Sequence, residues 1–366
     1  MNFDLNEEQV MLRDLVLRFA ADRYDPVKRL GYLRDPRGFS AEGWATIAET
    51  GLLAFPFAQE LGGFGGGAVE LITVMEALGR SVAVEPILPV IVMAGGLIER
   101  AGSPEQQAEL LPAITAGKTF AALAYSERDA RYGLEKVATM ATEDSAGTVV
   151  SGTKQMVLGG PFADDFLVVA RETTGAIGIF KIAADAPGVR RRDYRVVDGS
   201  VASDLDLSRA PAERLPDGQA ALEAALDEAR LGICGELMGL MSMIFDSTLD
   251  YLKTRNQFGQ AIGSFQAVQH RMADHYSRLE LSRGQVYRAA AQHGNRQDRG
   301  ASVSGAKAYI SQHALLLAED AVQLHGGIGT TEELMIGQAF KRVLLLSSLL
   351  GDSDWELQRY VALTRH

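Results

Sequence analysis

The sequence predicts a mainly α-helical protein with a central antiparallel β domain. Residues 1–118 carry apolar patterns of helical period with capping residues at their starts. Residues 119–215 hold short segments rich in Val, Ile, Phe or Thr, and Gly, Asp and Pro separate them. Residues 216–366 return to long helical patterns. We therefore expect an N-terminal helical domain, a middle β domain and a C-terminal four-helix bundle.

The first third of the chain contains clear helix start and stop signals. Asn6 is followed by two glutamates, a glutamine and an apolar pattern, which is typical of a capped amphipathic helix. Two further helices are expected at about residues 41–51 and 69–78. The glycine-rich stretch 62–67 lacks both the lysine and the preceding strand of a phosphate loop, so we interpret it as a turn between helices.

The other two domains have different sequence patterns. In the middle domain, strands are expected at residues 120–124, 148–151, 166–170 and 177–181. In the C-terminal part, long amphipathic helices are expected at residues 220–255, 265–293, 303–324 and 332–349. Long helices joined by brief turns predict a four-helix bundle.

Charge and composition exclude several classes of partner. The net charge of −11 comes from acids spread along the chain, so we expect no nucleic-acid partner. The longest apolar stretch, residues 86–98, is too short to span a membrane, and an acidic N-terminus is unlike a secretory signal. The single cysteine, Cys234, excludes an intramolecular disulfide and a cysteine-based zinc site, and we expect it to be buried. These features predict a cytoplasmic protein with no metal centre.

The segment from Arg255 to Gln266 is the first candidate site. It places an arginine and an aromatic at the end of one long helix and a glutamine at the start of the next. Arg255 could hold a pyrophosphate, Phe258 could pack on a planar ring, and Gln266 could offer an amide near a helix N-terminus. On spacing alone, an ordinary helix end with a core phenylalanine is the simpler interpretation.

The segment from Gln323 to Thr331 is the second candidate site. Gly326, Gly327 and Gly329 let backbone amides approach a ligand without hindrance from a Cβ atom, and a helix begins just after them. A helix C-cap turn explains one of these glycines well and three poorly. His325 is better interpreted as structural than as a base.

Together the two segments resemble the acyl-CoA dehydrogenase family. They read R-x-Q-F-G-x-x-I-x-x-F-Q and, some sixty residues later, Q-x-x-G-G-x-G. The α, β, α order is similar to that family over essentially the whole chain. The resemblance implies an FAD cofactor, an acyl-CoA substrate and electron-transfer flavoprotein as the electron acceptor. It also implies that these segments hold the FAD pyrophosphate and adenine of the neighbouring subunit, through Arg255, Phe258, Gln266, Gln323, Gly326, Gly327 and Gly329.

Smaller details are similar to one branch of the family. The stretches 22–25, 63–67, 74–80, 130–132, 340–342 and 349–352 resemble those of pimeloyl-CoA dehydrogenase small subunits. Related small subunits serve steroid side-chain degradation together with a separate large subunit. The branch therefore implies a homologous large subunit in a heterotetramer.

The chain departs from the family where a flavin ring would be held. The family pattern T-E-P-x-x-G-S-D is replaced by Ser126-Glu127-Arg128-Asp129-Ala130-Arg131-Tyr132. Where the family has a tryptophan strand, the chain reads Gln155-Met156-Val157-Leu158. We therefore expect this chain to lack the ring-stacking group and the hydroxyl hydrogen bond.

The catalytic base is also in question. In the family a carboxylate removes the α-proton, and one of its usual positions follows the last bundle helix. Counting without gaps places Leu350 there, and a shift by two places Asp352 there. The other known position is Ala229, before Arg230. Asp352 is the candidate base, and the alternative is that it caps the final helix.

Three functions remain open from the sequence. The first is a non-catalytic small subunit that shares one FAD per heterodimer with a catalytic large subunit. The second is a self-sufficient homo-oligomeric dehydrogenase with Asp352 as its base. The third is a flavin-free structural or binding paralogue. The acyl chain of the substrate is left open in each case.

Overall fold

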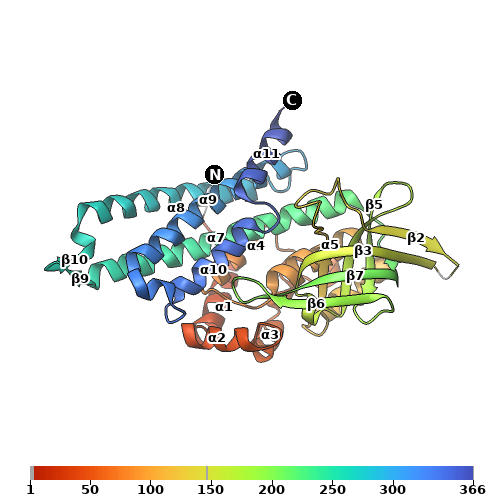
Figure 1. Cartoon of the computed structure of the whole chain (residues 1–366), viewed down its shortest axis with the longest axis horizontal. Helices are drawn as coiled ribbons and strands as arrows, with labels where there is room; N and C mark the ends of the chain where they lie inside the picture. Colours follow the sequence, from red (N-terminus) through yellow and green to blue (C-terminus); the bar gives the residue numbers. More distant parts are fainter. Residues whose placement is uncertain (1–3, 146, 366) are drawn as a thin grey trace. The chain divides into compact units, whose positions relative to one another are not determined.

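The computed structural model describes residues 4–145 and 147–365, and its contacts divide the chain into two compact units. The first unit contains the N-terminal residues to Gly31, then Gly67–Ala83, and the chain from Arg230 onward. The second unit contains Tyr32–Gly66 and Val84–Ala229. Figure 1 shows the helices and strands under the labels used below.

The first unit is built from helices. They are α1 (Glu7–Arg23), α4 (Ala68–Arg80), most of α7 (Gln219–Thr254), α8 (Gln266–Gln292), α9 (Arg299–His325), α10 (Met335–Ser348) and α11 (Ser353–Thr364). The helix α2 (Pro26–Arg34) spans the boundary between the units. The four long C-terminal helices that the sequence predicts are present, with ends that differ by a few residues. Helix α9 packs against α8, α10 and α11, which confirms a helical C-terminal domain.

The start of α1 follows its sequence signal. The Asn6 side chain accepts a hydrogen bond from the Gln9 amide at 2.8 Å, and the Gln9 side chain accepts one from the Asn6 amide at 2.9 Å. This reciprocal capping box satisfies two amides that the helix itself leaves unpaired. The predicted cap is confirmed.

Helices α4 and α7 cross at backbone contact. A Cβ atom added to Gly79 would overlap the carbonyl oxygen of Glu236, and one added to Gly239 would overlap the carbonyl oxygen of Glu76. Only glycine allows this approach. The acids beside the crossing pair with arginines: Arg342 Nε lies 2.6 Å from Glu236, and Arg283 Nη1 lies 3.0 Å from Glu76.

The second unit combines short helices with a sheet. Its helices are α3 (Ala41–Glu49), η1 (Leu52–Ala54), η2 (Gln59–Leu61), η3 (Ile87–Gly95), α5 (Gly96–Ala101), α6 (Pro104–Thr115) and η4 (Gly160–Phe162). Its strands are β1 (Ala121–Ala124), β2 (Met140–Asp144), β3 (Gly147–Leu158), β4 (Asp165–Arg171), β5 (Ile177–Ala183), β6 (Val189–Arg195), β7 (Val201–Pro211) and β8 (Glu213–Arg214). The strands form one sheet in the order β6-β7-β3-β2-β4-β5-β8, with β1 paired to β4.

The sheet is mixed rather than purely antiparallel as predicted. Strand β1 runs parallel to β4, with Ala121 opposite Asp165, and β2 makes one parallel pairing with β4 through Met140 and Arg171. The other ladders are antiparallel. The hairpin of β2 and β3 lies between β1 and β4 in the sequence, and this long connection allows a parallel neighbour.

The glycine-rich stretch 62–67 is a turn, as the sequence indicates. The amides of Gly63, Gly65 and Gly66 donate to carbonyl groups of residues 55–58. Since the chain itself uses these amides, they are not available to a phosphate group. The turn leads into α4.

Candidate functional site

Arg255 follows the last residue of α7. Its amide donates to the carbonyl of Tyr251 at 2.8 Å, and its carbonyl accepts from the amide of Ile262 at 2.9 Å. The backbone of Arg255 is therefore fixed. Its side chain is exposed, and within residues 4–145 and 147–365 it has no hydrogen-bond or ion-pair partner. A guanidinium group that is exposed on a fixed backbone is suited to an anionic ligand.

A two-residue hairpin projects beyond α7. Strands β9 (Asn256–Gln257) and β10 (Gln260–Ala261) pair antiparallel around Phe258 and Gly259. Both turn residues have positive φ, 55° for Phe258 and 85° for Gly259, which is the pattern of a type I′ turn. Asn or Gly usually takes such positions, because a bulky residue there is strained. In Figure 1 this hairpin lies at the far end of α7 and α8.

Phe258 is exposed to an unusual degree. The residue is 92% accessible, and its ring contacts Phe265 only at a centroid distance of 6.3 Å. The packing of this chain therefore does not explain a large aromatic in a strained turn. The sequence alone allowed a core phenylalanine, and the structure excludes that interpretation.

Gln266 is the first residue of α8, and its side chain is exposed. The preceding residue, Phe265, offers no side-chain cap to the helix. The Gln266 amide group makes no hydrogen bond with any residue that the structure describes. It remains available to a ligand beside a helix N-terminus.

The second segment begins at the end of α9. Gln323 is exposed on the last turn, and the helix η6 (Gly326–Thr330) follows His325 directly. Gly326 has φ 67°, which favours glycine, and a Cβ atom on Gly329 would lie 2.7 Å from the Val322 carbonyl oxygen. Two of the three glycines are therefore required by the chain itself.

Gly327 differs from its neighbours. Its φ is not positive, and a Cβ atom added there would meet nothing within 4 Å. Neither backbone conformation nor internal packing requires glycine at this position. Open space above a glycine is what a ligand that approaches the backbone needs.

One ring pair connects the two segments. The rings of Tyr251 and His325 stack at a centroid distance of 4.4 Å with an interplanar angle of 23°. Tyr251 lies one helical turn before Arg255, and His325 lies next to Gly326. The Tyr251 hydroxyl also donates to the His325 carbonyl at 3.4 Å. The helical period places position 251 next to Arg255, but nothing in the sequence indicates the contact with His325.

Asp352 lies at the start of α11. Its carboxylate accepts a hydrogen bond from the Trp355 amide at 2.9 Å, so it caps the helix as the alternative interpretation predicts. The turn before it is fixed by buried cations. Arg230 donates to the Leu350 carbonyl at 3.0 Å, and Lys307 donates to the Gly351 carbonyl.

The cations that hold this turn belong to a buried charged cluster. Arg230 Nε lies 2.8 Å from a carboxylate oxygen of Glu356, and both side chains are almost fully buried. Burial lowers the pKa of Lys307 to about 8, against the opposing attraction of Glu356. Cys234 is buried, as predicted. Burial raises the pKa of its thiol to about 12, so the thiol stays protonated. Residue 350, the other candidate base position, is a leucine that is 1% exposed.

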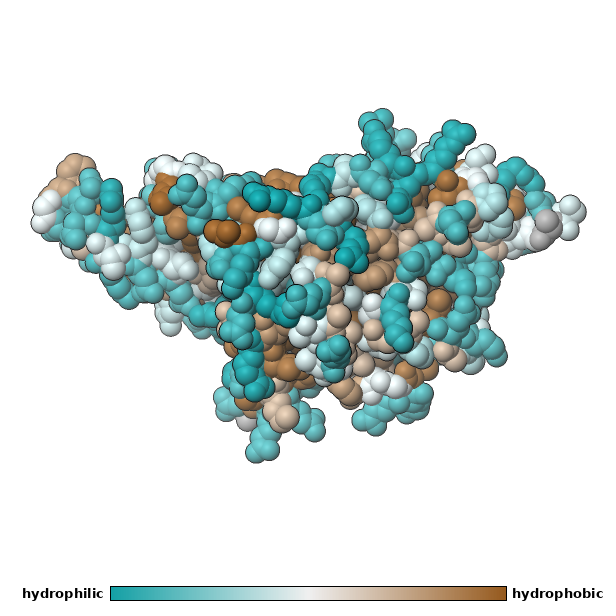
Figure 2. Space-filling model, turned by 90° about the horizontal axis from the view of Figure 1, so that it is seen from below, coloured by the Kyte–Doolittle hydropathy of each residue, from teal (hydrophilic) through white to brown (hydrophobic). Residues whose placement is uncertain are grey.

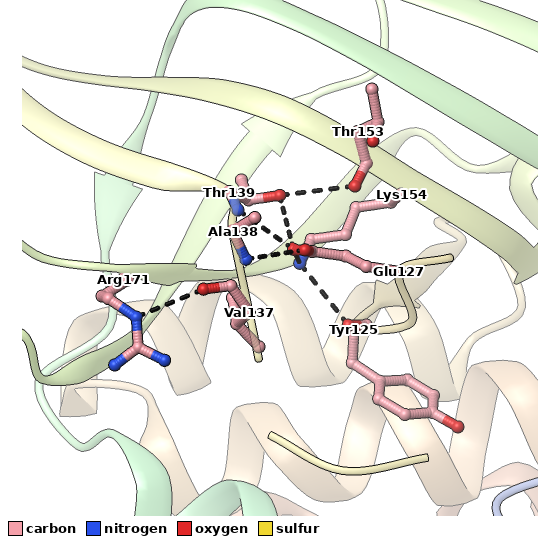
Figure 3. A network of polar contacts seen from close by, with 8 residues as sticks. All are labelled: Tyr125, Glu127, Val137, Ala138, Thr139, Thr153, Lys154 and Arg171. Carbon is pink, nitrogen blue, oxygen red and sulfur yellow. Dashed lines mark hydrogen bonds and ion pairs between the residues drawn. The ribbon is translucent and has the colours of Figure 1, made fainter. Parts of the chain in front are cut away.

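A second buried ion pair lies in the sheet unit (Figure 3). Lys154 Nζ lies 2.6 Å from Glu127 Oε1, and the Lys154 side chain is fully buried. Glu127 also accepts hydrogen bonds from the Ala138 amide at 2.7 Å and from the Thr139 amide at 3.1 Å and hydroxyl at 2.7 Å. These bonds close the base of the loop 127–139. This is the loop in which the sequence departs from the family pattern.

Charge in this ion pair is balanced against burial. Burial lowers the pKa of Lys154 to about 8, and the attraction of Glu127 opposes the shift. Burial raises the pKa of Glu127, but the charge and hydrogen bond of Lys154 and the bonds from residues 138 and 139 outweigh it, so the net shift is downward. Sequence patterns do not reveal this pair, because its two members lie on separate segments with no regular spacing.

Hydrophilic residues cover most of the face in Figure 2, and hydrophobic residues form separate patches between them. Among residues 4–145 and 147–365, no helix is long and apolar enough to cross a membrane.

The chain matches three domains of one family along its length. Residues 6–118 match the acyl-CoA dehydrogenase N-terminal domain, residues 122–208 the middle domain, and residues 217–362 the C-terminal domain. The chain belongs to the acyl-CoA dehydrogenase family.

Known relatives share the whole length of the chain. The probable acyl-CoA dehydrogenase FadE25 of Mycobacterium tuberculosis is 29% identical, and the alignment covers 98% of this chain and 95% of the relative. A variant of the Tcur3481-Tcur3483 steroid ACAD is 31% identical with a TM-score of 0.90, covering 98% of this chain and 97% of that one. A chain of the ChsE4-ChsE5 complex from Mycobacterium tuberculosis is 26% identical with a TM-score of 0.91, covering 100% of this chain and 100% of that one.

Proposed function

We propose that this chain is the small subunit of a heteromeric, FAD-dependent acyl-CoA dehydrogenase. The cofactor is FAD, and the related protein PigA, 26% identical over 99% of this chain, has been solved with FAD. In this proposal the chain contributes the adenine and pyrophosphate half of a flavin site, and a catalytic large subunit contributes the ring half and the base. The whole complex dehydrogenates an acyl-CoA thioester between its α and β carbons.

The observation that carries the proposal is a set of groups after the ends of α7 and α9 that no residue within 4–145 and 147–365 engages. Arg255 offers a free guanidinium, and Phe258, a residue that is 92% exposed, offers its ring in a strained turn. Gly327 leaves open space above its backbone. Arginine suits a diphosphate, an aromatic ring suits adenine, and an open glycine allows close approach. The residues present therefore fit the nucleotide part of FAD.

The remaining residues support a binding rather than a catalytic role. When bound, FAD would supply the acceptor for the hydride that leaves the β-carbon, and a carboxylate would be needed to take the α-proton. Asp352 already accepts the Trp355 amide, and Arg230 holds the carbonyl of Leu350 in the preceding turn. The candidate base is thus engaged in a helix cap. Ala229, the other base position, has no acidic group.

Two solved relatives carry paired names that suit a two-chain enzyme. These are the Tcur3481-Tcur3483 steroid ACAD and the ChsE4-ChsE5 complex. Both support a heteromer for this chain, and the first makes a steroid-type acyl-CoA the substrate to test first. We propose electron-transfer flavoprotein as the electron acceptor, in keeping with the family resemblance.

The test is to express the chain with the product of its neighbouring gene and to measure FAD per chain. The proposal expects one FAD for two chains in the complex and little FAD on this chain alone. Arg255→Ala should weaken FAD binding by roughly ten- to hundredfold, because a charge-assisted bond to a phosphate is lost. Lys253→Ala is the matched control, since it removes the same charge two residues away and should leave FAD binding unchanged.

The outcomes separate the three functions. Turnover by this chain alone, with one FAD per chain, would establish the homo-oligomeric enzyme. A colourless complex in every combination would establish the flavin-free paralogue. Equal FAD binding by wild type and Arg255→Ala would show that Arg255 is an ordinary helix-end charge.

A further inference from the structure

The two candidate segments need a fixed mutual distance to serve one ligand. Arg255 lies after α7, whereas the glycine turn lies after α9, some seventy residues later in the sequence. No strand ladder joins them, because the hairpin of β9 and β10 is a separate two-stranded sheet. A side-chain contact between the two helix ends can fix this distance.

The contact that meets this need is the stack of Tyr251 and His325. Its centroid distance of 4.4 Å and angle of 23° are those of a nearly parallel ring pair. The hydroxyl of Tyr251 reaches the carbonyl of His325, the last residue of α9, at 3.4 Å. The Tyr251 ring, one helical turn before the first segment, therefore contacts the His325 ring, which belongs to the second segment.

His325 is itself fixed on α9. Its Nδ1 lies 2.8 Å from the Ala321 carbonyl oxygen, and the residue is only 6% exposed. Because a carbonyl oxygen can only accept, Nδ1 carries the hydrogen. The imidazole plane is thus set by its own helix and gives Tyr251 a rigid surface.

Tyr251 transmits this position to Arg255 through the backbone. The Arg255 amide donates to the Tyr251 carbonyl at 2.8 Å, so Arg255 continues the last hydrogen-bonded turn of α7. The hairpin then begins at once, with the Arg255 carbonyl bonded to Ile262. A shift of Tyr251 against His325 would move Arg255 and the hairpin relative to Gly326 and Gly327.

We propose that Tyr251 and His325 are a positioning pair that sets the distance between Arg255 and the glycine turn, so that both segments bind the same nucleotide. This inference rests on the proposed function and adds two residues to the site. Neither residue is a catalytic residue, because both act through their neighbours.

The test is FAD binding to the oligomer in which the chain is purified, for three changes at one position. Tyr251→Phe keeps the ring and should bind FAD within twofold of wild type. Tyr251→Leu removes the ring and should weaken FAD binding by roughly five- to tenfold, with helical content and melting temperature close to wild type. If Tyr251→Leu does not assemble, Tyr251→Met is measured in its place, because it fills similar volume without a plane.

A matched control and a double variant give the inference its specificity. Tyr309 and His313 form another Tyr–His contact, at 4.2 Å on α9, and Tyr309→Leu should leave FAD binding unchanged. If Tyr251 acts through Arg255, the effects of Tyr251→Leu and Arg255→Ala should not multiply. The double variant should bind FAD no more than about twofold more weakly than Arg255→Ala alone.

The outcomes of the inference and of the proposed function are distinct. Normal FAD binding in Tyr251→Leu, together with a loss in Arg255→Ala, would overturn the positioning role and leave the proposed function standing. Fully multiplicative losses would also overturn it, because they would indicate a general loss of packing. Normal FAD binding in Arg255→Ala would overturn the proposed function itself.

Discussion

At the scale of single residues, Asp352 lies where two roles compete. A base needs a carboxylate with a free oxygen close to the substrate, whereas a cap needs one that faces its own helix. The carboxylate accepts the Trp355 amide, and the turn before it is held by Arg230 and Lys307. These contacts leave little freedom for a swing toward a ligand.

Substitutions at Asp352 should therefore affect stability and not turnover. Asp352→Ala removes the cap and should lower the free energy of unfolding by about 1 kcal/mol. Asp352→Asn keeps a capping oxygen and should change it by less than about 0.5 kcal/mol. Both variants should retain activity of the assembled complex within a few-fold. An activity loss of about a hundredfold or more in a folded Asp352→Asn complex would instead identify Asp352 as the general base.

The buried Lys154 offers a residue-level test through pH. Burial lowers its pKa to about 8 in the folded chain from the ordinary lysine value of 10.5. Below pH 8 the folded and unfolded states are both protonated at this residue. Between these two pKa values only the unfolded state keeps the proton, so rising pH favours the folded state.

The measurement compares wild type with Lys154→Met by chemical denaturation from pH 7 to pH 10.5. Titrating groups that do not contact Lys154 are shared by the two proteins and cancel in the difference. The free energy of unfolding of wild type, relative to the variant, should rise above pH 8 by at most on the order of 1 kcal/mol per pH unit. A constant difference over this range would show that burial does not perturb Lys154.

At the scale of elements, the crossing of α4 and α7 depends on backbone contact. A Cβ atom at Gly239 would overlap the Glu76 carbonyl oxygen, whereas one at Gly284 in α8 meets nothing within 4 Å. Gly239→Ala should therefore lower the free energy of unfolding by about 1–3 kcal/mol, because the helices must move apart. Gly284→Ala is the matched control and should raise it by about 0.5–1 kcal/mol, as expected for an exposed helix interior. Equal effects of the two changes in thermal unfolding would contradict the close crossing.

The helices and strands differ in how far the sequence predicts them. The helices of the C-terminal part were predictable because their apolar period runs over many turns. Strand β6 was not predictable, since four of its seven residues are arginines and they suit an exposed edge. Strand β7 alternates buried and exposed residues in part, but serines and aspartates interrupt its apolar run. The parallel placement of β1 is a long-range pairing that no local pattern indicates.

At the scale of the whole molecule, the sequence predicted the order of helical and β regions better than it predicted the site. Motif spacing singled out Arg255, Phe258 and the three glycines, and the family resemblance suggested their role. The sequence could not show that Phe258 is exposed or that Gly327 is free of internal contacts, because both properties depend on which residues pack nearby. The boundaries proposed at residues 118 and 215 and the binding roles of the site residues remain predictions.

The open space above Gly327 also has a consequence for genetic complementation. If the proposed function holds, a mutation from glycine to a larger residue at this position leaves its own polypeptide folded and abundant. The lost colour and the lost turnover are then measured on the other polypeptide, whose gene is intact. Complementation with a second copy of that intact gene fails, whereas a copy of this one restores the enzyme. A defect that is measured on the other polypeptide is thus caused by a mutation in the gene of this chain.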